Sequence, residues 1–200
     1  MESRPALRLF LAWMSGAEAT RPDWQEADDD RIASSLIGGP LPALRLETTA
    51  GAVDLAELAS ELLVLFIYPH ATGLPDAPVP GWDLIPGARG CTAQSCGFRD
   101  HHGRLRDLGA EIAGLSVQTV DEQRDFAARV GLHDRLISDP TRQLAAALGL
   151  PTFDVGGRTF YKRLTLIARG GRIVKVFYPV LEPGRNAADV VAWLESDYVR

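Results

Sequence analysis

The sequence predicts an α/β fold in which helices flank a central mixed β-sheet, because strand-like and helix-like segments alternate along most of its 200 residues. The longest unbroken apolar stretch, Leu62 to Tyr68, has the length of a buried strand. Farther on, Lys162 to Ala168 and Arg172 to Tyr178 alternate in polarity around Gly170-Gly171, a pattern typical of a β-hairpin. These segments supply the predicted sheet.

The remaining elements follow from the spacing of apolar residues and from flanking glycine and proline. In chain order we expect a strand over Leu44–Thr48, helices over Asp54–Ser60 and Cys91–Leu108, a strand over Glu111–Ser116, a helix over Val120–Val130, a strand over Arg135–Ser138, and helices over Pro140–Leu148 and Asn186–Tyr198. Proline at a helix start and glycine after its end, as in Pro140 and Gly149, are favourable positions.

A single domain with an N-terminal extension accounts for the length and composition. With 46% hydrophobic and 24% charged residues, the chain can bury one core. Residues 1–38 lack clear periodicity, and Gly38, Gly39 and Pro40 interrupt the pattern where this stretch ends. We therefore assign residues 1–38 to the extension and residues 39–200 to the domain.

Charge and hydropathy narrow the class of function. A net charge of −5 disfavours binding to nucleic acid or to an anionic membrane, because both require a cationic surface. No segment approaches the roughly eighteen apolar residues of a membrane span. The apolar patch Leu7–Met14 lies between Glu2 and the acidic run Glu26–Asp30, which fits a secretory signal poorly. We expect a soluble, cytoplasmic protein.

The strongest chemical signal is the segment that holds the two cysteines, Cys91 and Cys96. A glycine-rich loop ends at Gly90, so Cys91 falls at the predicted start of a helix. Unpaired backbone N–H groups and the helix dipole favour a thiolate there, and a thiolate is the nucleophilic form of cysteine. The neighbouring Arg89 can add to this effect or face solvent, and we favour solvent.

Two other interpretations of the cysteines are weaker. They could be small core hydrophobes, but both lie on one short segment and the first occupies the anion-stabilising position. A metal site would recruit His101 and His102, but adjacent histidines on a helix point in different directions, and zinc usually takes four ligands.

The spacing of the cysteines predicts a conformational change on oxidation. On an intact helix, an offset of five residues is about 140° around the axis and about 7.5 Å along it, so the Cα atoms lie about 8.5 Å apart. A relaxed disulfide needs less than about 7 Å. A bond between Cys91 and Cys96 therefore requires the turn to unwind, and the bracketing Gly90 and Gly97 favour this.

These residues resemble the peroxiredoxins, and within them the Q type, also called bacterioferritin comigratory proteins. The family pattern Gly-Cys-Thr-x-x-x-Cys-x-Phe/Leu-Arg-Asp matches Gly90 to Asp100 throughout. The similarity runs from about Pro40 to the C-terminus and includes Phe66-Ile67-Tyr68-Pro69, Ile137-Ser138-Asp139 and Arg163-Leu164-Thr165.

The resemblance implies a thioredoxin-like fold and a thiol-dependent peroxidase. Cys91 would attack hydrogen peroxide or an organic hydroperoxide and become a sulfenic acid, which Cys96 would resolve as an intramolecular disulfide. Arg163 matches the family's active-site arginine, whose planar donors hold the thiolate and the peroxide oxygens. No cofactor is implied. A thioredoxin-like or other dithiol would reduce the disulfide, and a monomer or weak homodimer would suffice because both cysteines belong to one chain.

One departure concerns the hydroxyl residue that precedes the cysteine by three positions. The family has Pro-x-x-x-Thr/Ser-x-x-Cys, whereas the proline and hydroxyl positions here are Leu84 and Ala88. Pro69 and Thr72 lie upstream, as if an insertion rich in proline and glycine had split the motif. Pro69 would then shield the pocket and Thr72 would supply the hydroxyl, with Thr92 as the alternative source.

Two other functions remain open on the residues alone. A thioredoxin-like disulfide oxidoreductase would use the same thiol chemistry, although its usual signature is Cys-x-x-Cys. A redox-sensing protein would use the Cys91–Cys96 disulfide to change the helix and, through it, a partner surface.

Overall fold

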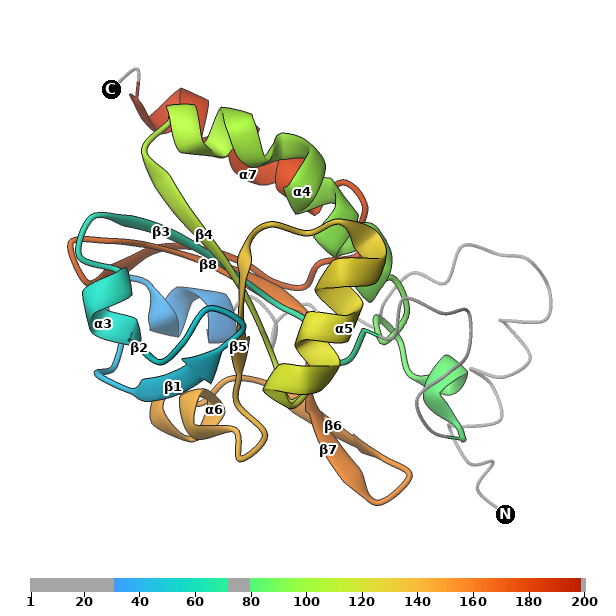
Figure 1. The fold of residues 1–200 in the computed structure, drawn as a ribbon. Helices are drawn as coiled ribbons and strands as arrows, with labels where there is room; N and C mark the ends of the chain where they lie inside the picture. Colours follow the sequence, from blue (N-terminus) through green and yellow to red (C-terminus); the bar gives the residue numbers. More distant parts are fainter. Residues whose placement is uncertain (1–30, 72–79, 199–200) are drawn as a thin grey trace, which may run out of the picture.

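The computed structural model of the chain describes residues 31–71 and 80–198. Within these ranges the main sheet has seven strands, in the spatial order β2 (Val53–Asp54), β1 (Arg45–Thr48), β5 (Arg135–Ser138), β4 (Ala110–Ser116), β3 (Leu62–Ile67), β8 (Leu164–Arg169) and β9 (Arg172–Phe177) (Figure 1). A separate hairpin consists of β6 (Thr152–Val155) and β7 (Arg158–Tyr161).

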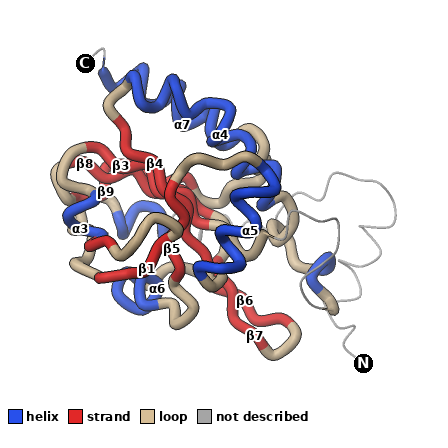
Figure 2. Tube along the Cα trace, in the orientation of Figure 1, coloured by secondary structure: helices blue, strands red, loops and turns tan. Residues whose placement is uncertain are grey.

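The helices of the described ranges separate into two layers, one on each face of the main sheet (Figure 2). They are α3 (Leu55–Leu58), α4 (Cys91–Asp107), α5 (Val120–Val130), α6 (Gln143–Leu148) and α7 (Asn186–Tyr198), with a 3-10 helix η1 (Trp82–Leu84). Buried residues of α4, α5 and α7 share one core cluster, and those of α3, α6 and the β6–β7 hairpin share the other.

Strand β3 lies at the centre of the sheet and is buried along its whole length. It pairs in parallel with β4 and antiparallel with β8, so the sheet is mixed, as the sequence predicts. Successive side chains of a strand point to opposite faces. Val64 and Phe66 accordingly join the core beneath α4, whereas Leu63 and Leu65 join the core beside α3 and α6.

The packing of α4 on this sheet depends on one glycine. Phe66 stacks on Phe98 of α4 with ring centroids 4.4 Å apart. Gly114 of β4 pairs with Phe66 in the sheet, and a Cβ atom there would lie 2.6 Å from the Phe66 ring and 2.6 Å from the Leu136 side chain. No heavier residue fits at 114 without displacing the stacked ring.

Three predicted boundaries are wrong by two residues or more: the helix predicted to end at Ser60 ends at Leu58, and the other two have local reasons. The helix predicted from Pro140 begins at Gln143, because the Asp139 carboxylate accepts the backbone N–H groups of Gln143 and Leu144, both at 2.9 Å. The strand predicted from Lys162 begins at Leu164, because the Lys162 N–H donates to the Pro151 carbonyl instead. This leaves Arg163 just outside the strand.

Three elements were not predicted: β2, η1 and the β6–β7 hairpin. The hairpin is only half-buried on its first strand, which weakens its apolar signal, although its turn is the pair Gly156-Gly157. The stretch assigned to the extension ends in a helical turn over residues 31–36, and Leu36 packs into the core cluster that contains α3 and α6.

Within the described ranges, no helix combines the length and apolar composition that crossing a membrane requires.

Candidate active site

The first residue of α4 is Cys91, and the glycine before it sets the direction in which the helix begins. Gly90 has φ +97°, in the left-handed region that favours glycine, and a Cβ atom there would lie 2.7 Å from Pro183. The Gly90 carbonyl accepts the Gln94 N–H, which closes the first helical turn. Cys91 is 4% exposed, so its sulfur lies in the core beneath this turn.

Arg163 brings a buried guanidinium to the Cys91 sulfur. It is 3% exposed, and its Nη2 donates to Cys91 Sγ at 3.1 Å and to the Arg89 carbonyl at 2.9 Å. The same nitrogen lies 3.3 and 3.4 Å from the carbonyls of Gly87 and Ala88. The guanidinium therefore ties the loop before α4 to the segment before β8 and places a cation against the thiol.

A chain of buried amides continues from Arg163 into α7. Arg163 Nη1 donates to Gln94 Oε1 at 2.6 Å, and Gln94 Nε2 donates to Asn186 Oδ1 at 2.9 Å. The Thr165 hydroxyl donates to the same Asn186 oxygen at 2.7 Å. Sequence reasoning missed Gln94 and Asn186, because polar residues 92 positions apart give no periodic signal.

Cys96 lies five residues after Cys91 on the same unbroken helix and is half-buried. Both cysteines are free thiols. The helical offset turns their side chains away from each other, as the spacing predicts, so the structure corresponds to the reduced state.

Of the remaining predicted residues, Pro69 and Thr92 lie in the described ranges and Thr72 does not. Pro69 is buried and directly follows Tyr68, whose pKa is raised by burial. The chain after Pro69 is fixed by Gln118, whose side-chain amide accepts from the Ala71 N–H at 2.8 Å and donates to the Ala71 carbonyl at 2.9 Å. Thr72 lies outside the described residues. Thr92 is half-buried on the first turn of α4.

Arg89 faces solvent, as the sequence analysis favoured, and pairs with Asp83 at 2.6 Å with 67% of its side chain exposed. The two neighbouring histidines have different partners: His101 Nδ1 lies 2.9 Å from the Gly97 carbonyl, and His102 Nδ1 lies 2.6 Å from Asp134.

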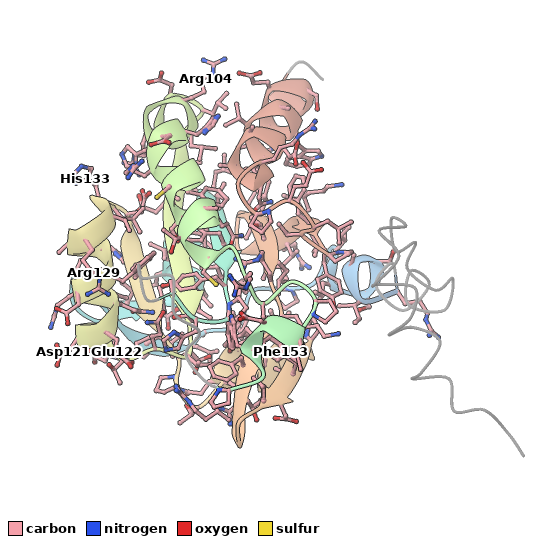
Figure 3. All side chains as sticks on the ribbon, turned by 90° about the vertical axis from the view of Figure 1, so that its right-hand side faces the viewer. Arg104, Asp121, Glu122, Arg129, His133 and Phe153 are labelled. Carbon is pink, nitrogen blue, oxygen red and sulfur yellow. The ribbon has the colours of Figure 1, made fainter. Side chains whose placement is uncertain are left out.

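An aromatic cluster and a small pocket adjoin Arg163. Trp82 packs against Phe153 and Phe160, with ring centroids 5.7 and 5.0 Å apart, and Figure 3 shows Phe153 beside η1. His70 meets the same cluster, and burial lowers its pKa. A cavity of about 160 Å³ adjoins this aromatic cluster at Phe153. It is lined by Ile85, Pro86, Gly87, Phe153, Lys162, Arg163, Tyr178, Pro179, Val180 and Leu181.

The mixed sheet with α4 on one face and a cysteine at the start of that helix is the thioredoxin-like fold, as predicted. The chain belongs to the Redoxin family, whose profile matches residues 36–194. Its curated relatives and several of its structural neighbours carry the names peroxiredoxin Q and bcp, which agrees with the resemblance carried by Gly90 to Asp100.

Among the relatives, peroxiredoxin bcp1 of Schizosaccharomyces pombe is 30% identical over 126 residues, which cover 62% of this chain and 57% of that protein. The chain likewise spans 59% of the length of the chloroplastic peroxiredoxin Q of Gentiana triflora. Two solved structures are 25% identical: peroxidoxin BcpB of Mycobacterium tuberculosis, with a TM-score of 0.65 over 80% of this chain and 96% of that one, and peroxiredoxin Q of Xanthomonas campestris, with a TM-score of 0.61 over 78% and 94%.

Proposed function

We propose that this protein is a thiol-dependent peroxidase that reduces hydrogen peroxide and organic hydroperoxides, with Cys91 as the nucleophile. The observation that carries the proposal is the contact of 3.1 Å between Arg163 Nη2 and Cys91 Sγ, made at the start of α4 where both side chains are buried. A guanidinium that donates to sulfur stabilises negative charge there, and its remaining donors suit a second oxygen ligand.

In the proposed reaction the Cys91 thiolate attacks the terminal peroxide oxygen. The O–O bond breaks, the sulfur is oxidised to sulfenic acid, and the other oxygen leaves with a proton as water or alcohol. Arg163 holds the thiolate and the peroxide in line, which lowers the entropic cost of bringing the reacting atoms together. The Cys96 thiolate then attacks the Cys91 sulfur, hydroxide leaves as water, and the intramolecular disulfide forms.

The cycle closes when an external dithiol reduces the disulfide. A thioredoxin-like protein is the proposed donor, and a reducing cytoplasm is the compartment that would supply it. Both cysteines belong to one chain, so a monomer or weak homodimer completes the cycle. We assign this chemistry to residues 39–200, with Pro69 shielding the thiol and either Thr72 or Thr92 orienting the peroxide in place of a hydroxyl at Ala88.

The test is the mass and the free-thiol count of the reduced protein after one equivalent of hydrogen peroxide. The native protein should lose both thiols and a mass of about two hydrogens, as disulfide formation requires. Cys91→Ser should keep its one remaining thiol and its mass, because it lacks the nucleophile. Cys96→Ser should consume one equivalent and stop at the sulfenic acid when no external thiol is present.

Three results would contradict the proposal. Peroxide consumption retained by Cys91→Ser would remove Cys91 from the reaction. Reduction of insulin disulfides without peroxide consumption would favour a disulfide oxidoreductase, and disulfide formation without steady turnover on a dithiol would favour a redox sensor.

A further inference from the structure

The buried amide chain ends at a residue for which the reaction scheme gives no role. Asn186 is the first residue of α7 and is 2% exposed. Its Oδ1 accepts two hydrogen bonds, from Gln94 Nε2 and from the Thr165 hydroxyl, at 2.9 and 2.7 Å. A single oxygen atom of Asn186 is therefore hydrogen-bonded both to the first turn of α4 and to strand β8.

The direction of each hydrogen bond in this chain is fixed by Arg163. A guanidinium has only donors, so the Gln94 atom that faces it must be the carbonyl oxygen. The Gln94 NH₂ group then faces Asn186, which must present its own oxygen. Asn186 supplies the acceptor that keeps the Gln94 amide in this orientation, because a flipped amide would set its NH₂ against the guanidinium.

The backbone before Asn186 places this acceptor against the cysteine turn. A Cβ atom on Gly90 would lie 2.7 Å from the Pro183 ring, and a Cβ atom on Gly97 would lie 3.1 Å from the Gly184 carbonyl oxygen. Residues 183–186 therefore lie directly against the first two turns of α4, the part of the helix that holds both cysteines. Larger residues at 90 or 97 would push this segment away.

We propose that Asn186 is a positioning residue for the peroxide reaction, acting on Arg163 through the Gln94 amide, and that it also holds the cysteine turn in its helical form. The inference rests on the proposed function. Gln94 lies between Cys91 and Cys96, so the unwinding that the disulfide requires must draw Gln94 away from both Arg163 and Asn186. One contact thus favours the first chemical step and opposes the second.

The test separates the two steps in Asn186→Leu, whose side chain has the same branched shape but no acceptor. Cys91 oxidation by hydrogen peroxide should slow about tenfold, because Arg163 loses its fixed partner. Formation of the disulfide from the sulfenic acid should become about fivefold faster, because a hydrogen bond that resists unwinding is lost. Both rates are followed by rapid quenching, thiol alkylation and mass measurement.

Two further variants exclude a general loss of stability. Asn186→Asp keeps the acceptor oxygen and should restore most of the rate of Cys91 oxidation. Thr48→Val is the control for lost buried hydrogen bonds. It removes a buried hydroxyl that bonds to backbone on β1, toward the other edge of the sheet, and should leave both rates unchanged. Faster resolution in Asn186→Leu should also reduce the yield of sulfinic acid at high peroxide, since the sulfenic acid is shorter-lived.

The outcomes distinguish this inference from the proposed function. If Cys91 of the native protein is not oxidised by one equivalent of peroxide, the proposed function fails. If the native protein reacts as proposed while Asn186→Leu shows the rates of Thr48→Val, or slows in both steps together, the proposed function stands and the role of Asn186 is refuted.

Discussion

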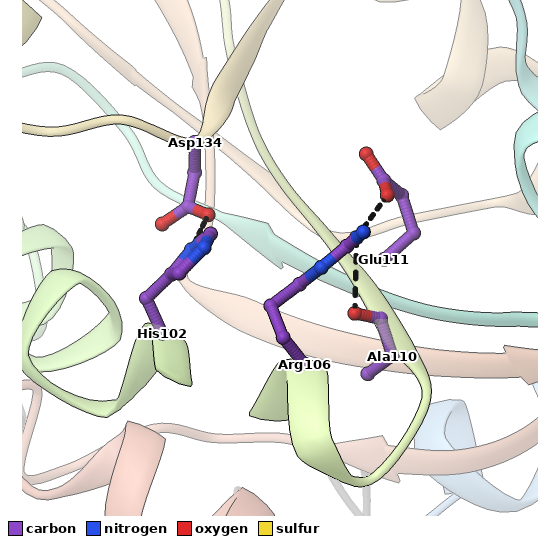
Figure 4. A network of polar contacts seen from close by, with 5 residues as sticks. All are labelled: His102, Arg106, Ala110, Glu111 and Asp134. Atoms are coloured by element: carbon purple, nitrogen blue, oxygen red, sulfur yellow. Dashed lines mark hydrogen bonds and ion pairs between the residues drawn. The ribbon is translucent and has the colours of Figure 1, made fainter. Parts of the chain in front are cut away.

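The two halves of α4 are held to the rest of the molecule by different kinds of contact. Residues 91–97 are fixed by buried side chains that share atoms, with Gln94 joined to both Arg163 and Asn186. Residues 98–107 also bury Phe98 and Leu105, but their polar side chains make separate contacts that share no atoms: His102 with Asp134 and Arg106 with Glu111, both shown in Figure 4, and Arg104 with Glu195.

If the disulfide forms as proposed, this difference would allow the helix to unwind at one end while the other end stays folded. Because Gln94 is hydrogen-bonded to both Arg163 and Asn186, we expect both contacts of the first half to break together when Gln94 moves. The contacts of the second half reach three different parts of the fold: the loop before β5, α7 and β4. None of them involves Arg163 or Asn186, so unwinding near the cysteines need not spread beyond Phe98, which stacks on Phe66.

The largest expected effect comes from removing the cation that organises the first half. Arg163→Met should slow oxidation of Cys91 by hydrogen peroxide about 100-fold, the order found when one preorganised donor to a developing charge is lost. Arg163→Lys keeps the charge but lacks the planar fork, so it should lose an intermediate amount. The rates are measured on reduced protein by competition for peroxide. An unchanged rate in Arg163→Met would show that the buried contact with Cys91 Sγ has no part in the reaction.

A matched pair of glycine substitutions compares the halves directly. Gly90→Ala should lower the free energy of unfolding by about 2 kcal/mol, since its φ is +97° and its Cβ would lie 2.7 Å from Pro183. Gly103→Ala, in the second half, meets no atom within 4 Å and should raise stability by about 1 kcal/mol through helix propensity. Denaturant unfolding measures both, and equal effects would contradict the difference between the halves.

A pH-dependent effect is expected at the anchor of the second half. The Asp134 side chain is 2% exposed, and burial raises its pKa, helped by Glu111 and opposed by His102 and His133. A carboxyl whose folded pKa is raised favours folding when protonated, so its contribution is lost as pH rises through that value. Asp134→Asn should therefore have a higher Tm than the native protein at pH 8, by a margin that shrinks toward pH 4. If the difference in Tm instead grows as the pH falls, burial does not raise the pKa of Asp134.

The smallest effect is expected for an exposed ion pair of the second half. Arg106 and Glu111 keep 49% and 36% of their side chains exposed, and such pairs contribute less than about 1 kcal/mol. Arg106→Gln should change Tm by little at low salt and by less at high salt, with no change in peroxide consumption. Loss of activity in this variant would mean that the second half also takes part in the cysteine chemistry.

The sequence predicted the main residues of the site, Cys91 and Arg163, but not the buried amides that hold Arg163 in place. The start of α4 at Cys91 follows from Gly90 and from the apolar spacing that comes after it, which are local properties. Arg163 was assigned by resemblance, because an arginine beside a strand is ordinarily an exposed residue. Its burial depends on the carbonyls of residues 87–89, and no local pattern reports that contact.

The amides that support Arg163 could not be predicted for the same reason. Asn186 stands at a helix start, where asparagine is common as a cap, so its position suggested an ordinary local role. Its partner Gln94 belongs to a different helix. The start of α6 was misplaced because Pro140 is a good first residue for a helix, whereas the backbone N–H groups of Gln143 and Leu144 are instead held by Asp139.

Gly114 has a consequence for how this fold can change over generations. The missing side chain on β4 makes the room that the Phe66 ring occupies, and Phe66 in turn carries Phe98 of α4. A larger residue at 114 is tolerated only if both the ring at 66 and the Leu136 side chain make room, and a smaller ring at 66 leaves a void beneath 98. Among related chains, positions 66, 98, 114 and 136 are therefore expected to vary together and not one at a time.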